Sequence, residues 1–490
     1  MEKQERVRFA PSPTGYLHIG GLRTALYNFL YARKRQGIFF LRIEDTDQKR
    51  IIEGAVPKLI DSLAWANILP EEGVVSCENG EMIEKGNYGP YVQSKRLDIY
   101  KKYAHELVER GKAYYCFCSP ERLENLRKKQ EEEKIAPAYD KCCLREVSPE
   151  EAKKRIQNGE KYVIRFDVPE TGETEFEDIV RGRVKFANKN IDDPVILKSD
   201  GYPTYHLAHV VDDFLMKTTV VFRGEEWLPS APKHILMFKA FGWDPPKYAH
   251  LCTILNKTSK KKLSKRDGDV SVEDFRKKGY LPEAVINFIA LLGWNPKTEQ
   301  EMFTLEQLAE QFDEKKLNRA GAIFDTEKLD WMNGIYIRKK SVDELMELCR
   351  PYLEKYIIDD DYLKKIVTVE QERMKTLSDI ENMAEVYLET PDYKKELLLW
   401  KKMSGKELLS SLQKSSELIG GIEKGEWEIE KIKDKLMEAA DQKNRGALLW
   451  PLRVALTGKE KSSSPFEVAW VLGREESVKR INQAITLIND

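Results

Sequence analysis

The sequence lacks an apolar run long enough to cross a membrane, and it has few cysteines. Its longest apolar stretch, residues 285–294, is about half of the roughly 20 residues that a membrane-spanning helix needs. The first residues, 1–6, are mostly charged and lack the apolar core of a signal peptide. The seven cysteines are scattered except for one cluster, which argues against a disulfide framework. We therefore expect a cytoplasmic protein without a membrane partner.

The chain also lacks an excess of charge of one sign. Its 81 basic and 82 acidic residues give a formal net charge of -1. The net charge gives no global positive field that would indicate nucleic-acid binding, so any surface that binds nucleic acid must be local, as in the basic residues 257–266. Such a run taken alone is more often a solvated face. With 490 residues, 41% of them hydrophobic, the chain can bury several cores, and we expect three or more folded units.

Apolar runs alternate with a helical pattern in the N-terminal half. Residues 7–10, 38–43 and 218–222 have the composition of buried parallel strands, as do residues 248–255. The helix expected between the first two runs has one apolar face, formed by Leu22, Ala25, Leu26, Phe29 and Leu30. This alternation predicts a doubly wound α/β sheet of the Rossmann type.

The pattern changes twice further along the chain. Residues 97–194 mix helical and β patterns, including possible strands at 162–168 and 183–187, which predicts an inserted α+β domain. Helical patterns dominate after residue 266, and strong helix formers such as those in 394–402 and 429–441 predict an all-α C-terminal half. The expected division is a Rossmann-type domain at 1–96 and 195–256, an insertion at 97–194, a loop and helical segment at 257–324, and an all-helical domain at 325–490.

The loop at residues 11–21 joins the first expected strand to the first expected helix. Pro and Gly in this turn aim unpaired backbone N–H groups and the positive helix end at an anion, so a nucleotide phosphate is expected here. Thr14 and His18 can add side-chain donors, while Gly20 and Gly21 keep the backbone uncovered. A Pro-Gly turn with one His is more often structural. His18, however, is one of six histidines and opens the helix directly.

The second motif is the lysine-rich stretch at residues 260–268. So many cations in a row cannot be buried unpaired, so we expect an exposed loop. Lys262 and Lys265 are placed to stabilise negative charge on a nucleotide triphosphate. For Lys260 and Lys261, a merely solubilising role is the better interpretation.

Two arginines stand where parallel strands end. Arg8 lies in the first expected strand and Arg223 closes the third, so both can reach the edge of the sheet where open α/β folds bind ligands. Guanidinium groups bind carboxylates bidentately. The pair therefore predicts an acidic ligand, although either arginine taken alone would be read as a surface ion pair.

In this order, the motifs at residues 11–21 and 260–268 resemble the two signatures of class I aminoacyl-tRNA synthetases, and specifically the glutamyl-tRNA synthetase family of bacterial type. The first signature ends in His in most of the class, whereas this chain has Gly21, and the glutamyl branch is similar in placing another residue there. Further matches run through essentially the whole chain, at residues 202–208, 210–213, 223–227, 321–325, 331–333 and 451–458.

The resemblance implies a set of site residues. Catalytic roles fall to His18, Lys262 and Lys265. ATP contacts fall to Thr14, His18, Gly20, Glu226, Leu255, Lys262, Ser264 and Lys265. Glutamate contacts fall to Arg8, Ala10, Ser12, Glu44, Tyr205, His209 and Arg223, with Glu44 facing the ammonium group and His209 standing where many relatives carry Asn.

The resemblance also implies an activity and its partners. With ATP and Mg²⁺, L-glutamate is converted to glutamyl adenylate and transferred to the 3' end of tRNA(Glu), and bound tRNA is often needed before glutamate is activated. The insertion at 97–194 is then the domain that binds the acceptor stem, 257–324 carries the lysine loop and the stem contact, and 325–490 binds the anticodon. We expect a monomer.

The cysteine cluster consists of Cys116, Cys118, Cys142 and Cys143. Thiolates at these spacings can bind zinc tetrahedrally. Some bacterial relatives bind zinc here through three Cys and a His, and the third Cys aligns with Cys143, which puts Arg145 at the position of the fourth ligand. Because Arg cannot bind a metal, Cys142 is the candidate replacement. Reduced free thiols without zinc are the alternative.

Three alternatives to a specific ligase remain open. A misacylating enzyme would also charge tRNA(Gln), and that choice depends on a few side chains that contact the anticodon. A non-catalytic tRNA-binding paralogue is disfavoured by His18, Lys262 and Lys265. A relative that glutamylates an anticodon base lacks the helical half present here.

Overall fold

The computed structural model describes residues 4–77, 80–264 and 270–489, and the chain divides into two compact units. The first unit comprises Met1–Phe275 and Val285–Thr326, and the second comprises Arg276–Ala284 and Glu327–Asp490. A Rossmann-type α/β fold followed by an all-helical C-terminal half is confirmed. The domain boundaries drawn from the sequence stay predictions.

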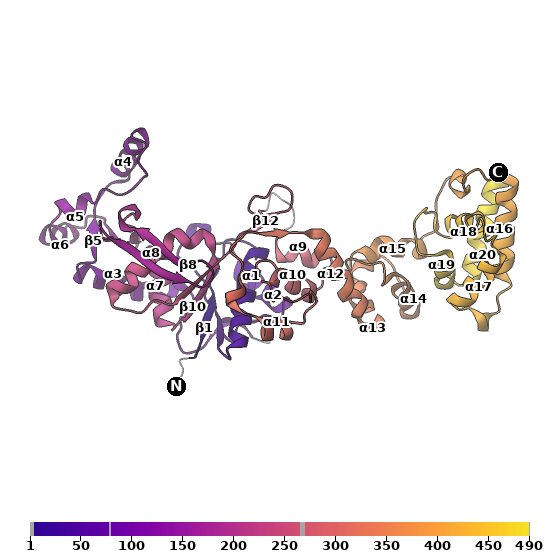
Figure 1. Cartoon of the computed structure of the whole chain (residues 1–490), viewed down its shortest axis with the longest axis horizontal. Helices are drawn as coiled ribbons and strands as arrows, with labels where there is room; N and C mark the ends of the chain where they lie inside the picture. Colours follow the sequence, from indigo (N-terminus) through magenta and orange to yellow (C-terminus); the bar gives the residue numbers. More distant parts are fainter. Residues whose placement is uncertain (1–3, 78–79, 265–269, 490) are drawn as a thin grey trace. The chain divides into compact units, whose positions relative to one another are not determined.

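The first unit is built on a sheet with the strand order β4-β3-β2-β1-β10-β11-β7-β8 (Figure 1). The strands from β3 to β7 in this order run parallel to their neighbours, while β4 and β8 pair antiparallel at the two edges. The strands are β1 (Arg6–Phe9), β2 (Ile38–Leu41), β3 (Glu72–Ser76), β4 (Met82–Lys85), β7 (Glu173–Asp178), β8 (Gly182–Ala187), β10 (Val220–Gly224) and β11 (Lys247–Leu251).

The central strands are apolar because helices cover both faces of the sheet. The chain passes from β1 through α1 (Ile19–Lys34) to β2 in one direction, and from β10 through α8 (Ala231–Phe241) to β11 in the other. Right-handed crossovers in opposite directions place the two helices on opposite faces. Accordingly, Phe222 packs on Tyr31 of α1, whereas its neighbour Val221 packs with Ile235 of α8.

The order of the strands reverses between β1 and β10, where Val7 lies beside Val220. In open α/β sheets, a crevice forms at the carboxyl ends of the strands at such a point, and ligands bind there. The loop after β1 and the residues that follow β10 therefore frame the expected site. The remaining helices of this part of the chain are α2 (Ala55–Trp65), α3 (Leu97–Glu109), α4 (Pro120–Glu132), α5 (Cys142–Glu146), α6 (Pro149–Gln157), α7 (Tyr205–Leu215), α9 (Val272–Lys277), α10 (Pro282–Ala290) and α11 (Leu305–Gln311).

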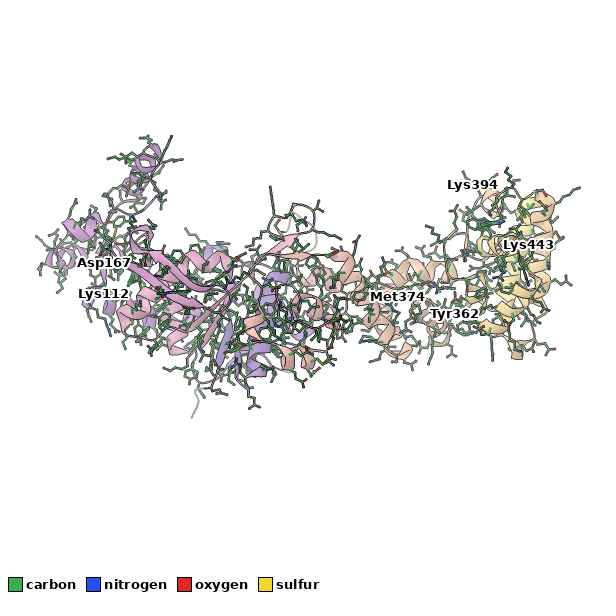
Figure 2. All side chains as sticks on the ribbon, in the orientation of Figure 1. Lys112, Asp167, Tyr362, Met374, Lys394 and Lys443 are labelled. Atoms are coloured by element: carbon green, nitrogen blue, oxygen red, sulfur yellow. The ribbon has the colours of Figure 1, made fainter. Side chains whose placement is uncertain are left out.

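The stretch expected to form a separate inserted domain divides between two sheets. β5 (Ala113–Cys116), β6 (Val163–Phe166) and β9 (Val195–Leu197) form a small antiparallel sheet, next to which the N–H of Asp167 donates to the Lys112 carbonyl at 2.9 Å (Figure 2). The β7–β8 hairpin instead joins the main sheet, with Asp178 beside Tyr248. Alternate residues of β7 are buried, and Phe176 packs against Tyr248, which explains why this hairpin extends the main sheet.

Residues 248–255 were expected to form one strand but form parts of two. β11 ends at Leu251, and β12 (Ile254–Asn256) pairs with β13 (Ala322–Phe324) in a separate two-stranded sheet. Between them, the N–H of Thr253 donates to Glu225 Oε1 at 2.7 Å. A side chain therefore takes the donor that a continuous strand would have given to its neighbour.

The second unit is helical around one apolar core, with α16, α18 and α20 packed side by side (Figure 1). Residues 394–402, expected to be helical, form only the short 3-10 turn η8 (Lys395–Leu398), because the Leu397 carbonyl accepts the indole N–H of Trp450 at 2.9 Å. The helices are α12 (Thr326–Lys339), α13 (Val342–Cys349), α14 (Asp360–Glu370), α15 (Asp379–Leu388), α16 (Gly405–Gly420), α17 (Ile429–Ala439), α18 (Gly446–Thr457), α19 (Pro465–Leu472) and α20 (Arg474–Asn489).

Across residues 4–77, 80–264 and 270–489, none of the helices combines the length and the apolar character that crossing a bilayer requires.

Candidate active site

A cavity of about 1180 Å³ lies where β1 and β10 end. Several separate stretches of the sequence line it, including the loop after β1, the residues after β2, the start of α7, the end of β10 and the base of the lysine-rich loop. The predicted site residues that line this cavity are Arg8, Ala10, Ser12, Thr14, His18, Gly20, Glu44, Tyr205, Arg223, Glu226, Lys262 and Ser264. Lys265 lies outside the described residues.

His18 is the N-cap of α1. Its Nδ1 accepts the backbone N–H of Gly20 at 3.0 Å. An Nδ1 that accepts a hydrogen bond carries no proton, so the neutral ring carries its proton on Nε2. The N-cap hydrogen bond therefore orients the imidazole and leaves Nε2–H as its donor. This donor lies at the N-terminus of α1, the end of a helix that favours anions.

Gly21, the residue that replaces the second His of the signature, lies against protein atoms. A Cβ built at this position would lie 2.9 Å from Cδ1 of Leu17 and 3.7 Å from the Phe9 ring. Leu17 is buried, so it cannot move aside easily. A larger residue at position 21 would have to displace the turn that holds His18.

Backbone hydrogen bonds join the first signature segment to the residues that follow the lysine-rich loop. The N–H of Ile19 donates to the Val270 carbonyl at 2.8 Å, and the N–H of Val272 donates to the Leu17 carbonyl at 2.9 Å. On the other side of the lysine loop, Lys262 forms a β-bridge with Leu255. Leu255 thus holds the base of the loop and does not itself line the cavity.

Lys262 Nζ lies 3.1 Å from Glu226 Oε1, and both side chains are more than half exposed. An ion pair this exposed contributes little to stability. The pair can therefore separate at little cost when a phosphate approaches Lys262.

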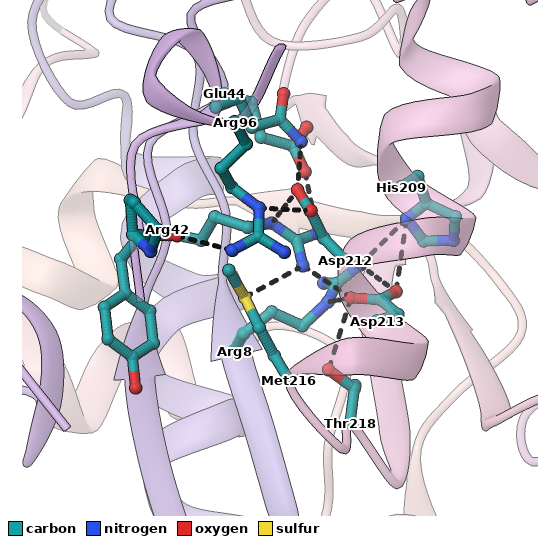
Figure 3. A network of polar contacts seen from close by, with 12 residues as sticks. Arg8, Arg42, Glu44, Arg96, His209, Asp212, Asp213, Met216 and Thr218 are labelled. Carbon is teal, nitrogen blue, oxygen red and sulfur yellow. Dashed lines mark hydrogen bonds and ion pairs between the residues drawn. The ribbon is translucent and has the colours of Figure 1, made fainter. Parts of the chain in front are cut away.

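A buried ionic network surrounds the guanidinium of Arg8 (Figure 3). Arg8 Nε and Arg42 Nη1 both donate to Asp213 Oδ1, at 3.1 and 2.7 Å, and Arg42 Nη2 donates to Glu44 Oε1 at 2.8 Å. Arg96 Nε donates to Asp212 Oδ1 at 2.8 Å. The network thus sets three guanidinium groups against three carboxylates, and its charges balance.

The network shifts the titration of its carboxyl groups. Burial raises the pKa of Glu44 above its usual value, and the attraction of Arg42 and Arg8 counters only part of this effect. For Asp213, burial also acts to raise the pKa, but Arg8 and Arg42 outweigh it and the pKa is lowered. Asp213 is therefore the carboxyl group that ionises more readily. Glu44 is the one whose ionised form a cation in the cavity would stabilise most.

Arg223 is held in a different way. Its Nε donates to His250 Nε2 at 3.0 Å, and its Nη1 lies 3.1 Å from the Tyr205 hydroxyl and 3.2 Å from His234 Nδ1. His209 is fully buried between Arg8 and Tyr248, 3.3 Å from each, and does not line the cavity. His209 therefore supports the side chains of Arg8 and Tyr248. It is not at the cavity wall, where the expected direct contact with glutamate would require it.

Comparisons with known proteins agree on one assignment. The family model described as tRNA synthetases class I (E and Q), catalytic domain, matches residues 4–331, and the one described as anticodon binding domain matches residues 344–485. Glutamate–tRNA ligase of Finegoldia magna is 45% identical over 98% of this chain and 99% of the relative. That of Clostridium botulinum is 46% identical over 99% of both chains.

Solved structures agree as well. A glutamate tRNA ligase from Elizabethkingia meningosepticum, in complex with its amino acid, superposes with a TM-score of 0.88 at 36% identity over 99% of each chain. The chain belongs to the glutamate–tRNA ligase family. Its Rossmann-type unit is the catalytic part of a class I aminoacyl-tRNA synthetase, and the family's anticodon-binding region spans most of the helical half.

The cysteine cluster of this ligase brings three of its four members together. The sulfur atoms of Cys116, Cys118 and Cys143 all lie within 4.8 Å of one another, a spacing that a tetrahedral zinc ion can bridge. Cys142 points elsewhere, and its sulfur lies 3.1 Å from Glu146. The hydroxyl of Tyr139 instead lies 3.5 Å from the sulfur of Cys116 and 3.3 Å from that of Cys118.

Sequence reasoning missed several residues of the ligase site. Asp213 lies within the matched residues 210–213 without a predicted role, and Arg42, His234, His250 and Asp178 were not predicted. Buried polar residues within otherwise apolar elements, such as His234 in α8 and His250 in β11, were the available signal, because burying a polar group requires a specific partner.

Proposed function

We propose that this cavity activates L-glutamate with ATP and transfers it to the terminal ribose of tRNA(Glu) without a covalent enzyme intermediate. The observation that carries the proposal is that the first signature segment lines one cavity together with Lys262 and Ser264 of the second. Main-chain bonds of Ile19 with Val270 and of Leu17 with Val272 also fix the first segment to the residues that follow the lysine-rich loop. Beside them lie a buried carboxylate, Glu44, and two buried guanidinium groups, Arg8 and Arg223. This combination suits a triphosphate next to an acidic amino acid.

In the first step, the α-carboxylate of glutamate attacks the α-phosphorus of ATP, and pyrophosphate leaves. The Nε2–H of His18 and the ammonium groups of Lys262 and Lys265 stabilise the charge that develops on the phosphate oxygens. Magnesium enters as the complex with ATP and neutralises part of the phosphate charge. Glu44 accepts the substrate ammonium group, and Ala10, Ser12 and Tyr205 complete the amino-acid pocket.

In the second step, a hydroxyl of the terminal ribose attacks the activated carbonyl, and AMP leaves. Alignment of the two substrates supplies much of the rate. Residues 97–194 bind the acceptor stem and residues 325–490 the anticodon. The protein acts as a monomer in the cytoplasm.

The proposal is tested by measuring ATP–pyrophosphate exchange and aminoacylation with each of the twenty amino acids, with and without tRNA. Glutamate-dependent exchange that needs tRNA, followed by charging of tRNA(Glu), supports it. Charging of tRNA(Gln) as well would identify a misacylating ligase, and tRNA binding without exchange would identify a non-catalytic paralogue.

Two variants test the assignment of individual residues. Lys265→Ala should reduce adenylate formation far more than tRNA binding. Arg223→Gln should weaken the use of glutamate and leave the KM for ATP nearly unchanged. Equal loss of adenylate formation and tRNA binding in the first variant, or unchanged glutamate kinetics in the second, would contradict these roles.

We also propose that Cys116, Cys118 and Cys143 bind a structural zinc ion, with the Tyr139 hydroxyl as the fourth donor. The hydrogen bond with Cys143, followed by those with Tyr139 and Arg165, lowers the pKa of Cys116 and so favours a metal-binding thiolate. The same hydrogen bond raises the pKa of Cys143, whose proton would leave when the metal binds. Zinc content measured by atomic absorption should be one ion per chain, should fall in Cys143→Ser and should be retained in Cys142→Ser. Equal zinc content in the two variants would contradict this ligand set.

A further inference from the structure

Four of the six histidines of the chain gather around Arg223 and the network beside it: His206, His209, His234 and His250. His234 and His250 contact Arg223 directly and are fully buried. An arginine side chain has five N–H donors and no acceptor. Each imidazole must therefore present an unprotonated nitrogen to Arg223, which fixes its tautomer.

The second ring nitrogen of each imidazole, the one that does not face Arg223, also has a hydrogen-bond partner. With its Nε2 accepting from Arg223, His250 carries its proton on Nδ1 and donates it to Asp178 Oδ2 at 2.6 Å. With its Nδ1 accepting, His234 carries its proton on Nε2, which lies 3.1 Å from His206 Nδ1. Asp178 therefore determines which nitrogen of His250 faces Arg223, and His206 does the same for His234.

Both imidazoles are neutral at physiological pH. Burial lowers the pKa of His234 well below the usual value, and the charge of Arg223 lowers it further. Burial and Arg223 likewise lower the pKa of His250, although Asp178 acts in the opposite direction. Arg223 also lies over the Tyr248 ring, 4.8 Å from its centre, which is another neutral partner.

The two arginines of the pocket thus differ in the charge of the groups that they contact. Arg8 is paired directly with the Asp213 carboxylate. In the described part of the chain, the groups that Arg223 contacts are neutral, and its Nη2 makes only a long contact of 3.5 Å with the Trp227 carbonyl. Glutamate brings two carboxylates and one ammonium group, a net charge of -1, next to the buried network in which Arg8, Arg42 and Arg96 are already paired with Asp212, Asp213 and Glu44.

We propose that His234 and His250 are positioning residues for the selection of an acidic substrate. They fix the guanidinium of Arg223 through neutral acceptors, so that its charge and its Nη2 edge are left for the side-chain carboxylate of the amino acid. Carboxylate partners would hold Arg223 as firmly but would neutralise it, and an amide side chain such as that of glutamine would then bind as well. Asp178 acts through His250 by fixing its tautomer. The inference rests on the proposed function.

The test compares substitutions that remove the acceptor with substitutions that keep it. In His234→Leu and His250→Leu, the KM for glutamate should rise about ten-fold or more, the loss expected for a hydrogen bond to a charged group. The KM for ATP should stay within two-fold. The conservative His234→Gln, whose amide oxygen can accept from Arg223, should recover most of the affinity for glutamate. His105→Leu, which removes a histidine bonded to Tyr115 away from Arg223, is the matched control.

Asp178→Asn provides a second measurement that keeps every side chain in contact with Arg223 and changes only the tautomer of His250. An amide can donate to His250 Nδ1 and so turn a proton on Nε2 toward Arg223, which should lower the preference for glutamate over glutamine in kcat/KM by about ten-fold. Unchanged KM for glutamate in the Leu variants, or a parallel rise in the KM for ATP, would overturn the positioning role. If the unmodified protein does not activate glutamate at all, the proposed function fails instead, and the two failures are distinguishable.

Discussion

The backbone N–H of Ile19 donates to the carbonyl oxygen of Val270 at 2.8 Å, which joins the first turn of α1 to the segment that follows the lysine-rich loop. Val272 makes the second such bond, to Leu17. The two strongest motifs of the sequence, separated by more than two hundred residues, are therefore neighbours through main-chain bonds that do not depend on a ligand.

Replacing Val272 with Pro tests these main-chain bonds. Val272 is the first residue of α9, a position that tolerates Pro, so this substitution mainly removes the N–H that Leu17 accepts. The KM for ATP should rise about ten-fold, the loss expected for one hydrogen bond, while the KM for glutamate changes little. Val272→Ala keeps the N–H and should affect the KM for ATP much less. An equal effect of the two variants on ATP would show that side-chain volume, and not the N–H, matters here.

Gly21→Ala should slow the activation of glutamate by ATP, because the added methyl group contacts Leu17. The added Cβ would lie 2.9 Å from Leu17 Cδ1, so the turn carrying His18 must shift. Pyrophosphate exchange should fall several-fold, and the double variant Gly21→Ala with Leu17→Ala should recover part of it because the obstructing methyl group is gone. No recovery, with the double variant still folded by circular dichroism, would contradict the steric explanation.

His18→Asn separates capping from chemistry. Asn is a good N-cap, so thermal stability should be close to that of the unmodified protein, while adenylate formation should fall at least a hundred-fold because the imidazole N–H is lost. His18→Ala should lose about 1 kcal/mol of stability in addition. Adenylate formation at a normal rate in His18→Asn would mean that His18 is a cap and nothing more.

Arg42→Met should destabilise the first unit strongly. Arg42 is fully buried and donates to both Asp213 and Glu44, so its loss leaves two buried carboxylates with less compensation, at a cost of about 3–5 kcal/mol. Denaturant unfolding measures this cost. Arg33→Met, which removes an exposed pair with Glu71, is the control and should cost less than about 1 kcal/mol. Similar losses in the two variants would contradict the importance of the buried network.

The stability of the first unit should fall below pH 6.5 partly because of His234. Its folded pKa lies well below the unfolded value near 6.5 because of burial, with Arg223, His206 and His209 acting in the same direction and Asp213 opposing. The unfolded chain therefore takes up the proton first, so the stability contribution is full above pH 6.5 and decreases as the pH falls.

Between pH 7 and 5.5, this proton uptake costs about 1 kcal/mol for one such histidine. His234→Gln should lose that much less stability over the same interval. Hydrogen exchange of the amides in β10 and β11 measures it for this unit alone. An identical pH dependence in both proteins would contradict the lowered pKa.

Much of this site follows from local sequence rules. Arg8 and Arg223 could be placed because parallel strands end at a common edge, and His18 because a helix must begin after the loop. The partners of these residues could not. Asp178 lies in a hairpin whose charged alternation, Glu173 to Asp178, is typical of an exposed strand. Whether that hairpin pairs within the insertion or with β11 depends on long-range packing, here of Phe176 on Tyr248. The same limit explains residues 394–402, where tertiary bonds override helix propensity.

The attachment of the β7–β8 hairpin to β11 has a consequence for how the molecule can be divided. Excising the insertion at its sequence boundaries would uncover an unpaired strand edge and take away the carboxylate that orients His250. A shortened enzyme that still distinguishes acidic from neutral amino acids should therefore keep the β7–β8 hairpin. Only the small sheet of β5, β6 and β9, with the helices beside it, can be deleted.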